Sequence, residues 1–270
     1  MAKRNFKDKT VVITGGASGI GLATAQRFAR AGARLALIDA DGDGLARCAE
    51  DFRRQGVPVE AITTDVTSQP DCAAAMDRII ARFGGIDVLF NNAGITQRGA
   101  FRDTDVSVYQ RVMAVNFFGA LYCTKAAIDS LIARCGVIIS NESIAGVAPV
   151  LGRTGYCASK HAMHGLFTSL RAEVRHLGVH VMIVCPGFIK TNLQTRALGC
   201  DGTVTRHPQS HVGRHDTAEN AADAIFRGAE RERPMIVLTP VGKLGVLLSR
   251  FVPAFYERQM TRRLKSELDY

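Results

Sequence analysis

The chain has 270 residues, of which 47% are hydrophobic and 22% are charged, and it contains 26 glycines. This length and composition indicate a single compact α/β domain whose core is large enough to need no disulfide support. The formal net charge is +9, and residues 231–265 alone contribute +6. The rest of the chain is only mildly basic, so we expect no nucleic-acid-binding face on the main domain.

The seven cysteines are odd in number and scattered, and no Cys-x2-Cys pair is present. Neither a disulfide framework nor a zinc site is expected from this pattern, and no metal is predicted. The first nine residues are polar and lead directly into the first predicted strand. We therefore expect no signal peptide and a cytoplasmic location.

Apolar runs alternate with helix-period segments along the whole chain. The predicted strands are Val11–Thr14, Arg34–Asp39, Val57–Ile62, Ile86–Asn91, Gly136–Ser140, His180–Cys185 and Met235–Leu238. The predicted helices cover residues 19–31, 43–55, 70–83, 105–133, 155–177 and 217–230. Because the strands are apolar almost throughout, both faces should be buried, as in a parallel sheet. The alternation predicts one doubly wound α/β domain, with about seven parallel strands and helices on both faces.

A glycine-rich turn, Thr14-Gly15-Gly16-Ala17-Ser18-Gly19-Ile20-Gly21, joins the first strand to the first helix. Glycines let the backbone approach a pyrophosphate closely, and the N-terminus of a helix favours its charge. The Gly-x3-Gly-x-Gly spacing differs from Gly-x-Gly-x2-Gly, and the Lys-Ser/Thr of a P-loop is missing after Gly21. The segment predicts a dinucleotide site, and a tight turn without a ligand is the alternative interpretation.

Asp39 ends the second predicted strand, 18 residues after Gly21. A carboxylate at this place can bind both hydroxyls of an adenosine ribose, and it repels a 2′-phosphate. Ala40 and Asp41 follow, with no Arg to compensate. Asp39 therefore predicts NAD rather than NADP, and a helix N-cap or turn aspartate is the alternative.

Tyr156 and Lys160 lie four residues apart on one face of a predicted helix, and Ser143 precedes Tyr156 by 13 residues. A free phenol has a pKa of about 10 and is a poor base near neutral pH. An ammonium group fixed beside the phenol stabilises the phenolate, as acid–base catalysis requires. The segment therefore predicts an acid–base site at Tyr156.

Over roughly residues 8–238 the sequence resembles the short-chain dehydrogenase/reductase family, in its short NAD-preferring branch. The motifs that carry the resemblance are Thr14-Gly15-x3-Gly19-Ile20-Gly21, Asp65-Val66, Asn91-Asn92-Ala93-Gly94, Asn116 in Val-Asn-Phe-Phe-Gly, Ser143, Tyr156-x3-Lys160 and Pro186-Gly187-x3-Thr191. The resemblance implies a Rossmann-type fold and a catalytic set of Asn116, Ser143, Tyr156 and Lys160. It also implies cofactor contacts from Gly15, Ser18, Gly19, Ile20, Gly21, Asp39, Asp65, Val66, Asn92, Ala93, Gly94, Tyr156, Lys160, Pro186, Gly187, Ile189 and Thr191.

The resemblance also implies a role for each catalytic residue. Tyr156 gives or takes the hydroxyl proton, and Ser143 hydrogen-bonds the substrate oxygen where charge develops. Lys160 lowers the pKa of the tyrosine and binds the nicotinamide ribose, and Asn116 positions a water that links Lys160 to solvent. Asp65 contacts the adenine, and Thr191 holds the nicotinamide carboxamide. Asn91 and Gly94 stabilise the central strands.

The activity implied by the resemblance is NAD(H)-dependent interconversion of a secondary alcohol and a ketone, in a homodimer or homotetramer. Residues 144–153 and 188–215 should form the substrate pocket, with 199–215 as a lid, and the apolar first segment favours a lipophilic substrate. The alternatives are an enoyl reductase, a branch that usually spaces Tyr and Lys more widely, and a membrane-associated nucleotide-binding protein. One departure from the family is Glu142, which either tunes substrate choice or faces solvent. His161 and His164 are expected to be packing or surface residues.

We expect residues 1–240 to form the NAD-binding catalytic domain and residues 241–270 to form an amphipathic, basic extension of it. Apolar residues recur at helical spacing, and Pro253 should divide them into two short helices, neither long enough to span a bilayer. The stripe consists of Leu244, Leu247, Leu248, Phe251, Phe255, Tyr256, Met260 and Leu264. It packs over the pocket or a neighbouring subunit, or it makes a weak contact with an anionic membrane.

Overall fold

The computed structural model describes residues 3–205 and 215–268. Seven parallel strands form one sheet in the order β3-β2-β1-β4-β5-β6-β7. Their bounds are β1 Thr10–Thr14, β2 Arg34–Asp39, β3 Val59–Thr63, β4 Val88–Asn91, β5 Val137–Asn141, β6 His180–Cys185 and β7 Met235–Val237. The chain builds outward from β1 to β3 and then returns to β4 on the other side of β1, so the predicted doubly wound sheet is confirmed. A ligand crevice is expected at this reversal point, beyond the carboxyl ends of the strands.

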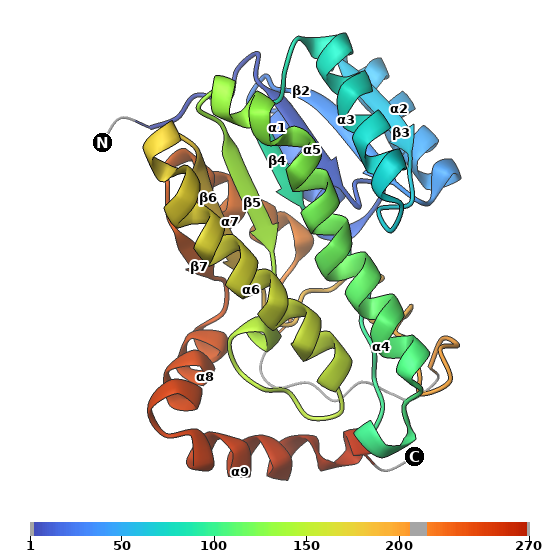
Figure 1. Cartoon of the computed structure of the whole chain (residues 1–270), viewed down its shortest axis with the longest axis vertical. Coiled ribbons are helices and arrows are strands. Elements are labelled where there is room, and N and C mark those ends of the chain that lie inside the picture. The colour runs from blue at the N-terminus through green and yellow to red at the C-terminus, as the bar shows by residue number, and fades with distance from the viewer. Residues whose placement is uncertain (1–2, 206–214, 269–270) are drawn as a thin grey trace.

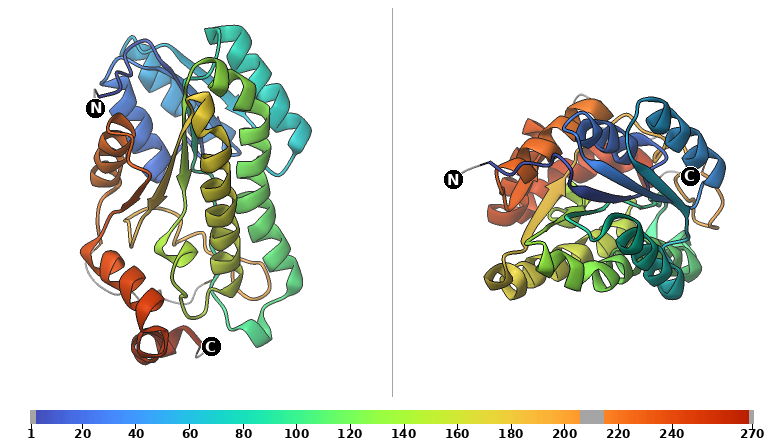
Figure 2. Two further views of the ribbon diagram at one scale, coloured as in Figure 1. Left: turned by 60° about the vertical axis from the view of Figure 1, so that its left-hand side comes forward. Right: turned by 90° about the horizontal axis from the view of Figure 1, so that it is seen from above.

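Helices cover both faces of the sheet, as the view from above in Figure 2 shows. One face carries α1 Gly19–Ala29, α2 Gly42–Arg54 and α7 Ala218–Glu230. The other face carries α3 Gln69–Phe83, α5 Gly119–Ala133 and α6 Thr154–Val174, with α4 Val106–Met113 leading into α5. This is the arrangement that right-handed crossovers between parallel strands produce.

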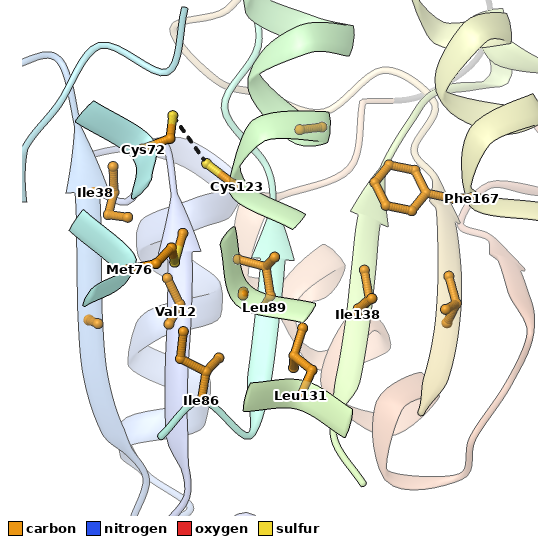
Figure 3. Packing of buried hydrophobic residues seen from close by; sticks show 14 of the residues in the cluster. Val12, Ile38, Cys72, Met76, Ile86, Leu89, Cys123, Leu131, Ile138 and Phe167 are labelled. Atoms are coloured by element: carbon orange, nitrogen blue, oxygen red, sulfur yellow. Dashed lines mark hydrogen bonds between the residues drawn. The ribbon is translucent and has the colours of Figure 1, made fainter. Parts of the chain in front are cut away.

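The two faces of the sheet each have their own buried core. Successive residues of β1 point to opposite sides, so Val12 packs against α3 and α5 while Val11 and Ile13 pack against α1 and α2. Figure 3 shows the first core, where strand residues such as Leu89 and Ile138 meet side chains from the helices. Within it the sulfurs of Cys72 and Cys123 are 3.7 Å apart as free thiols. This double burial explains why the strands are apolar almost throughout rather than alternating.

The helix predicted over residues 105–133 is continuous in direction but irregular in its middle. One turn, Ala114–Phe118, is a π-helix that separates α4 from α5. A π turn shifts the helical register by about one residue relative to an α-helix. The shift places Asn116 on the inner side, where it is 0% exposed.

The C-terminal segment forms two short helices, α8 Pro240–Phe251 and α9 Pro253–Leu264. Pro253 lies in the first turn of α9, where its missing N–H breaks no helical bond, so the predicted division at this residue is confirmed. Figure 1 shows α9 across the lower end of the molecule, below the sheet. Within the described residues, every helix is too short or too polar to cross a bilayer.

Candidate active site

A cleft of about 1310 Å³ lies beyond the carboxyl ends of the strands. Its walls come from the loops after β1, β2, β3, β4, β5 and β6 and from α8 and α9. The predicted site residues that line it are Gly15, Ser18, Gly19, Ile20, Asp39, Asp65, Val66, Asn92, Ala93, Gly94, Ser143, Tyr156, Lys160, Pro186, Gly187, Ile189 and Thr191. Two predicted residues, Gly21 and Asn116, lie outside its lining. The motifs that are far apart in the sequence therefore meet in one place.

The glycine turn between β1 and α1 needs its glycines for conformation and for close packing. Gly15 and Gly19 have φ values of +66° and +55°, in the left-handed region that favours glycine. A Cβ on Gly21 would lie 2.1 Å from the carbonyl oxygen of Gly15. Gly21 therefore serves the packing of α1 against the turn rather than a direct contact in the cleft. Ser18 begins α1 without a side-chain cap, which leaves the first N–H groups of the helix for a ligand.

Asp39 is fixed beside this turn by two backbone hydrogen bonds. Its carboxylate oxygens accept from the N–H groups of Ala17, at 2.9 Å, and Asp41, at 3.0 Å. Asp41 rather than Asp39 caps α2, by accepting from the N–H of Gly44 at 2.9 Å. Arg34, at the start of β2, donates to a carbonyl of the N-terminal loop at 2.6 Å, far from the end of the strand. The carboxylate thus reaches the cleft from the end of β2 with Arg34 held elsewhere.

Thr14 and Asn92 join the ends of β1 and β4, where the strand order reverses. The hydroxyl of Thr14 accepts from the N–H groups of Asn92 and Ala93, at 3.0 Å each. The side-chain amide of Asn92 donates to the carbonyls of Thr14 and Gly15 and accepts from the amide of Asn141 at 2.8 Å. These bonds fix the spacing between the glycine turn and the loop after β5, which carries Ser143.

Ser143 and Tyr156 both line the cleft, and the side chain of Ser143 favours the ionised form of the phenol. Tyr156 is only 8% exposed. Burial raises the pKa of its phenol above the ordinary value, and the side chain of Ser143 and the guanidinium of Arg153 oppose this rise. This direction is opposite to the lowering expected from Lys160, and burial is its largest cause.

Lys160 follows Tyr156 by one helical turn, and its ammonium lies 5.8 Å from the centre of the phenol ring. The Nζ atom donates to the carbonyl oxygen of Asn141 at 2.8 Å. Burial lowers the pKa of Lys160 to about 8, and the carboxylate of Glu142 opposes that fall. The ammonium is therefore oriented by the end of β5 and lies to one side of the tyrosine.

Asn116 is buried in the π turn, and its side chain bonds to protein groups on two sides. Its side-chain oxygen accepts from the N–H of Ile95 at 2.8 Å, and its amide donates to the carbonyl of Ile95 and the hydroxyl of Ser159. These bonds connect the loop after β4 to α6, the helix that carries Tyr156 and Lys160. The side chain of Asn116 lies outside the cleft lining and links Ile95 to Ser159 on α6.

Glu142 does not face solvent, so that alternative from the sequence is wrong. Its side chain is 0% exposed, and one carboxylate oxygen lies 2.9 Å from Nδ1 of His164. The hydroxyl of Ser140 donates to the other oxygen at 3.5 Å. His164 is therefore a partner of the buried Glu142 carboxylate. His161 has no such role in the cleft, because its Nδ1 lies 2.9 Å from the carbonyl of Cys157 in its own helix. In the sequence, the Glu142–His164 pair is indicated only by the position of Glu142 immediately before Ser143.

The substrate end of the cleft has apolar walls on two sides. The loops after β5 and β6 contribute Ile144, Val150 and Leu193, and the C-terminal helices contribute Leu244, Leu248, Phe255, Met260 and Leu264. The hydroxyl of Tyr256 donates to the carbonyl of Pro149 at 2.9 Å, which attaches α9 to the opposite wall. The guanidinium of Arg153 lies 4.0 Å from the carboxylate of Glu267. The inner face of the C-terminal segment therefore packs over the pocket. Most of the lid expected at residues 199–215, namely 206–214, lies outside the described residues.

Comparison with known proteins agrees with this geometry. A family model described as short chain dehydrogenase matches residues 9–198. The chain belongs to the short-chain dehydrogenase/reductase family. Dehydrogenase/reductase SDR family member 7B of Bos taurus is 34% identical to this family member over 97% of its chain and 83% of the relative. The SDR family protein 7-like of Drosophila melanogaster is 32% identical over 97% and 82% of the two chains.

Solved structures support the same assignment of this dehydrogenase/reductase. A short chain dehydrogenase/reductase from Burkholderia phymatum in complex with NAD superimposes with a TM-score of 0.84 and 25% identity, covering 93% of this chain and 96% of that one. A short-chain dehydrogenase from Streptomyces avermitilis gives a TM-score of 0.80 and 26% identity, covering 94% and 96%. The protein is thus an oxidoreductase with the fold of this family over nearly its whole length.

Proposed function

We propose that this family member interconverts a secondary alcohol and a ketone with NAD(H) and acts on a lipophilic substrate. The observation that carries the proposal is the placement of Ser143, Tyr156 and Lys160 in the same cleft as the glycine turn. One end of the cleft thus offers a proton donor, and the other offers a place for a dinucleotide. We expect the enzyme to work as a homodimer or homotetramer.

The residues at the dinucleotide end fit NAD. The turn around Gly15 and Gly19 brings backbone N–H groups and the N-terminus of α1 to the cleft, which suits a pyrophosphate. The carboxylate of Asp39 suits the two hydroxyls of an adenosine ribose. A Cβ on Gly19 would lie 3.2 Å from the side chain of Thr191, so the turn and the loop after β6 meet closely. When bound, NAD(H) supplies or accepts the hydride.

Tyr156 is suited to hold the proton that accompanies the hydride. Because burial raises the pKa of its phenol, Tyr156 carries its proton near neutral pH and can donate it to a carbonyl oxygen. Ser143 can donate a second hydrogen bond to the same oxygen, where negative charge develops. In the oxidation direction, the positive charges of Arg153 and Lys160 support removal of the proton from the phenol. Tyr156 therefore serves both directions, as the proton donor in reduction and as the proton acceptor in oxidation.

The proposed preference for a lipophilic substrate rests on the walls formed by α8 and α9. Leu248, Phe255 and Met260 line the cleft together with Val150 from the loop after β5. An apolar pocket with a few convergent polar groups binds mainly by removing apolar surface from water. The polar groups at its inner end are those of Ser143 and Tyr156.

The test is a panel of secondary alcohols, ketones and α,β-unsaturated carbonyl compounds of increasing apolar size, followed by formation or consumption of NADH. We expect turnover with alcohols or ketones, and Tyr156→Phe should lower it by at least about 10²-fold with NAD binding little changed. Tyr122→Phe on α5, outside the cleft lining, is the matched control and should keep full turnover. Near-wild-type turnover of Tyr156→Phe on a verified substrate would refute the mechanism. Turnover of the unsaturated compounds alone would favour an enoyl reductase.

A further inference from the structure

A buried carboxylate lies behind the catalytic lysine. Lys160 is 4% exposed, and its Nζ donates to the carbonyl of Asn141, the residue that precedes Glu142. The side chain of Glu142 is 0% exposed and lines the same cleft. His164 follows Lys160 by four residues on α6, so both side chains lie on the face that packs toward the end of β5.

The electrostatic partners of this carboxylate are two basic side chains, His164, whose Nδ1 lies 2.9 Å away, and Lys160. Lys160 and His164 face it from α6, Ser140 from β5 and Cys185 from β6. Burial raises the pKa of the Cys185 thiol far above its ordinary range, so this neighbour stays neutral. Burial also raises the pKa of Glu142, and the hydrogen bond and charge of His164 and the charge of Lys160 oppose that rise. The carboxylate form is thus supported by two basic groups.

We propose that Glu142, held by His164, is the buried counter-charge that keeps Lys160 protonated, and so acts as a positioning residue for Tyr156 and Lys160. This inference deepens the proposed function and rests on it. An ammonium group without a counter-charge tends to lose its proton when it is buried. Lys160 can stabilise the phenolate of Tyr156 only while it carries its charge. The side chain of His164 is 31% exposed, so it lies between the buried carboxylate and solvent.

The direct test measures the protonation of Lys160 without any substrate. The protein is labelled with ¹³C at the lysine Cε atoms and titrated by NMR, and Lys160→Arg assigns the signal. Glu142→Gln removes the charge at nearly constant shape, and we expect it to lower the pKa of Lys160 by about one unit or more. Glu142→Asp keeps the charge and should leave the pKa closer to the wild-type value. An unchanged titration in Glu142→Gln would overturn the proposal.

His164→Ala provides a second variant at a partly exposed position, in case Glu142→Gln does not fold. Without the imidazole the buried carboxylate binds its proton more readily, so the pKa of Lys160 should again fall. No shift in a folded His164→Ala protein would count against the role of this pair. The titration needs no turnover. Its failure is therefore separate from a failure of Tyr156→Phe to abolish the proposed reaction.

The pH profile of carbonyl reduction gives the functional readout once a substrate is known. Reduction requires protonated Tyr156 and charged Lys160, so the rate falls as pH rises through the apparent pKa of this coupled pair. Loss of a nearby negative charge lowers the pKa of either group, and Glu142→Gln should therefore move the alkaline limb to lower pH by about one unit. At a pH above both limbs this is about a tenfold lower rate than that of the wild type. A uniform fall in rate with an unmoved limb would indicate a merely structural residue.

Discussion

The carboxylate of Asp39 accepts hydrogen bonds from the backbone and also lines the cleft where the cofactor is expected. Its two oxygens accept hydrogen bonds from Ala17 and Asp41, so the charge is held at the end of β2 before any cofactor binds. A 2′-phosphate at the same place would bring a second negative charge against it. This fixed charge is the basis for a prediction about cofactor choice.

We expect the wild-type protein to bind NAD(H) more tightly than NADP(H). Asp39→Asn should reduce this preference by at least about tenfold, because the amide no longer repels the phosphate. Titration calorimetry with both cofactors measures the two affinities. Asp41→Asn is the matched control, since Asp41 caps α2 and should affect stability more than cofactor choice. Equal or tighter NADP binding by the wild type would contradict the prediction and point to Arg47, because Arg34 is held at the other end of β2.

The sequence located most of the residues that line the cleft but not how they act on one another. Fixed spacings on a strand end or a helix, such as that between Tyr156 and Lys160, determine where side chains emerge. The pKa of Tyr156 depends instead mainly on burial, which the folded chain provides and the spacing of residues does not show. For the same reason Glu142 could be noticed but its contact with His164 could not be predicted.

At the scale of the elements, the helical pattern did not show which apolar side chains face the sheet. Val112, Met163 and Phe167 lie on helices that are apolar on more than one side, yet each is at most 1% exposed and belongs to the core of one chain. The outward face of α5 and the preceding π turn carries Phe118, 40% exposed, which stacks with Phe117 and Tyr122. An element that is apolar on two sides gives no periodic signal for its orientation. The π turn adds a register shift that the sequence pattern does not show.

The exposed aromatic face of α5 leads us to keep the prediction of a dimer or tetramer. Phe118→Glu should shift the protein toward a monomer, because the charge would be buried at the contact. Light scattering at micromolar concentration measures the mass. Phe101→Glu is the control, because Phe101 is 73% exposed in a different region, just before α4, and should leave the assembly intact. A wild-type protein that shows only the 29.1 kDa species would contradict the prediction.

At the scale of the whole molecule, the C-terminal helices have two different faces. Their inner residues, such as Leu248, line the cleft, whereas Leu247 and Phe251 lie outside its lining and are 55% and 72% exposed. The exposed charges of α8 are Lys243 and Arg250, both positive. Figure 1 shows these helices at one end of the molecule, beyond the sheet. The packing of the inner face over the pocket therefore leaves an apolar, basic outer face beside the entrance to the cleft.

We predict that this outer face gives weak, salt-sensitive binding to anionic liposomes. Apolar side chains inserted at a membrane surface gain free energy by burial, and each nearby Lys or Arg adds about 1 kcal/mol at low salt. Sedimentation with liposomes of anionic and of neutral lipids measures the binding. A truncation after Thr239 should abolish it, and the double change Leu247→Ser with Phe251→Ser should weaken it by at least about tenfold while turnover persists.

Leu248→Ser tests the inner face of the C-terminal helices, as the double change tests the outer face. This residue lies one position from Leu247 but lines the cleft, so the change should raise KM for a lipophilic substrate by several-fold, roughly the loss of one buried apolar side chain, and leave liposome binding intact. If the wild-type protein does not sediment with anionic liposomes at low salt, the membrane contact is wrong and the segment serves the pocket alone. The truncated protein would then lose substrate affinity or oligomer stability without any change at a membrane surface. Liposome binding that survives the double change would place the contact elsewhere on the basic surface, because the exposed leucine and phenylalanine are the apolar groups on which this prediction depends.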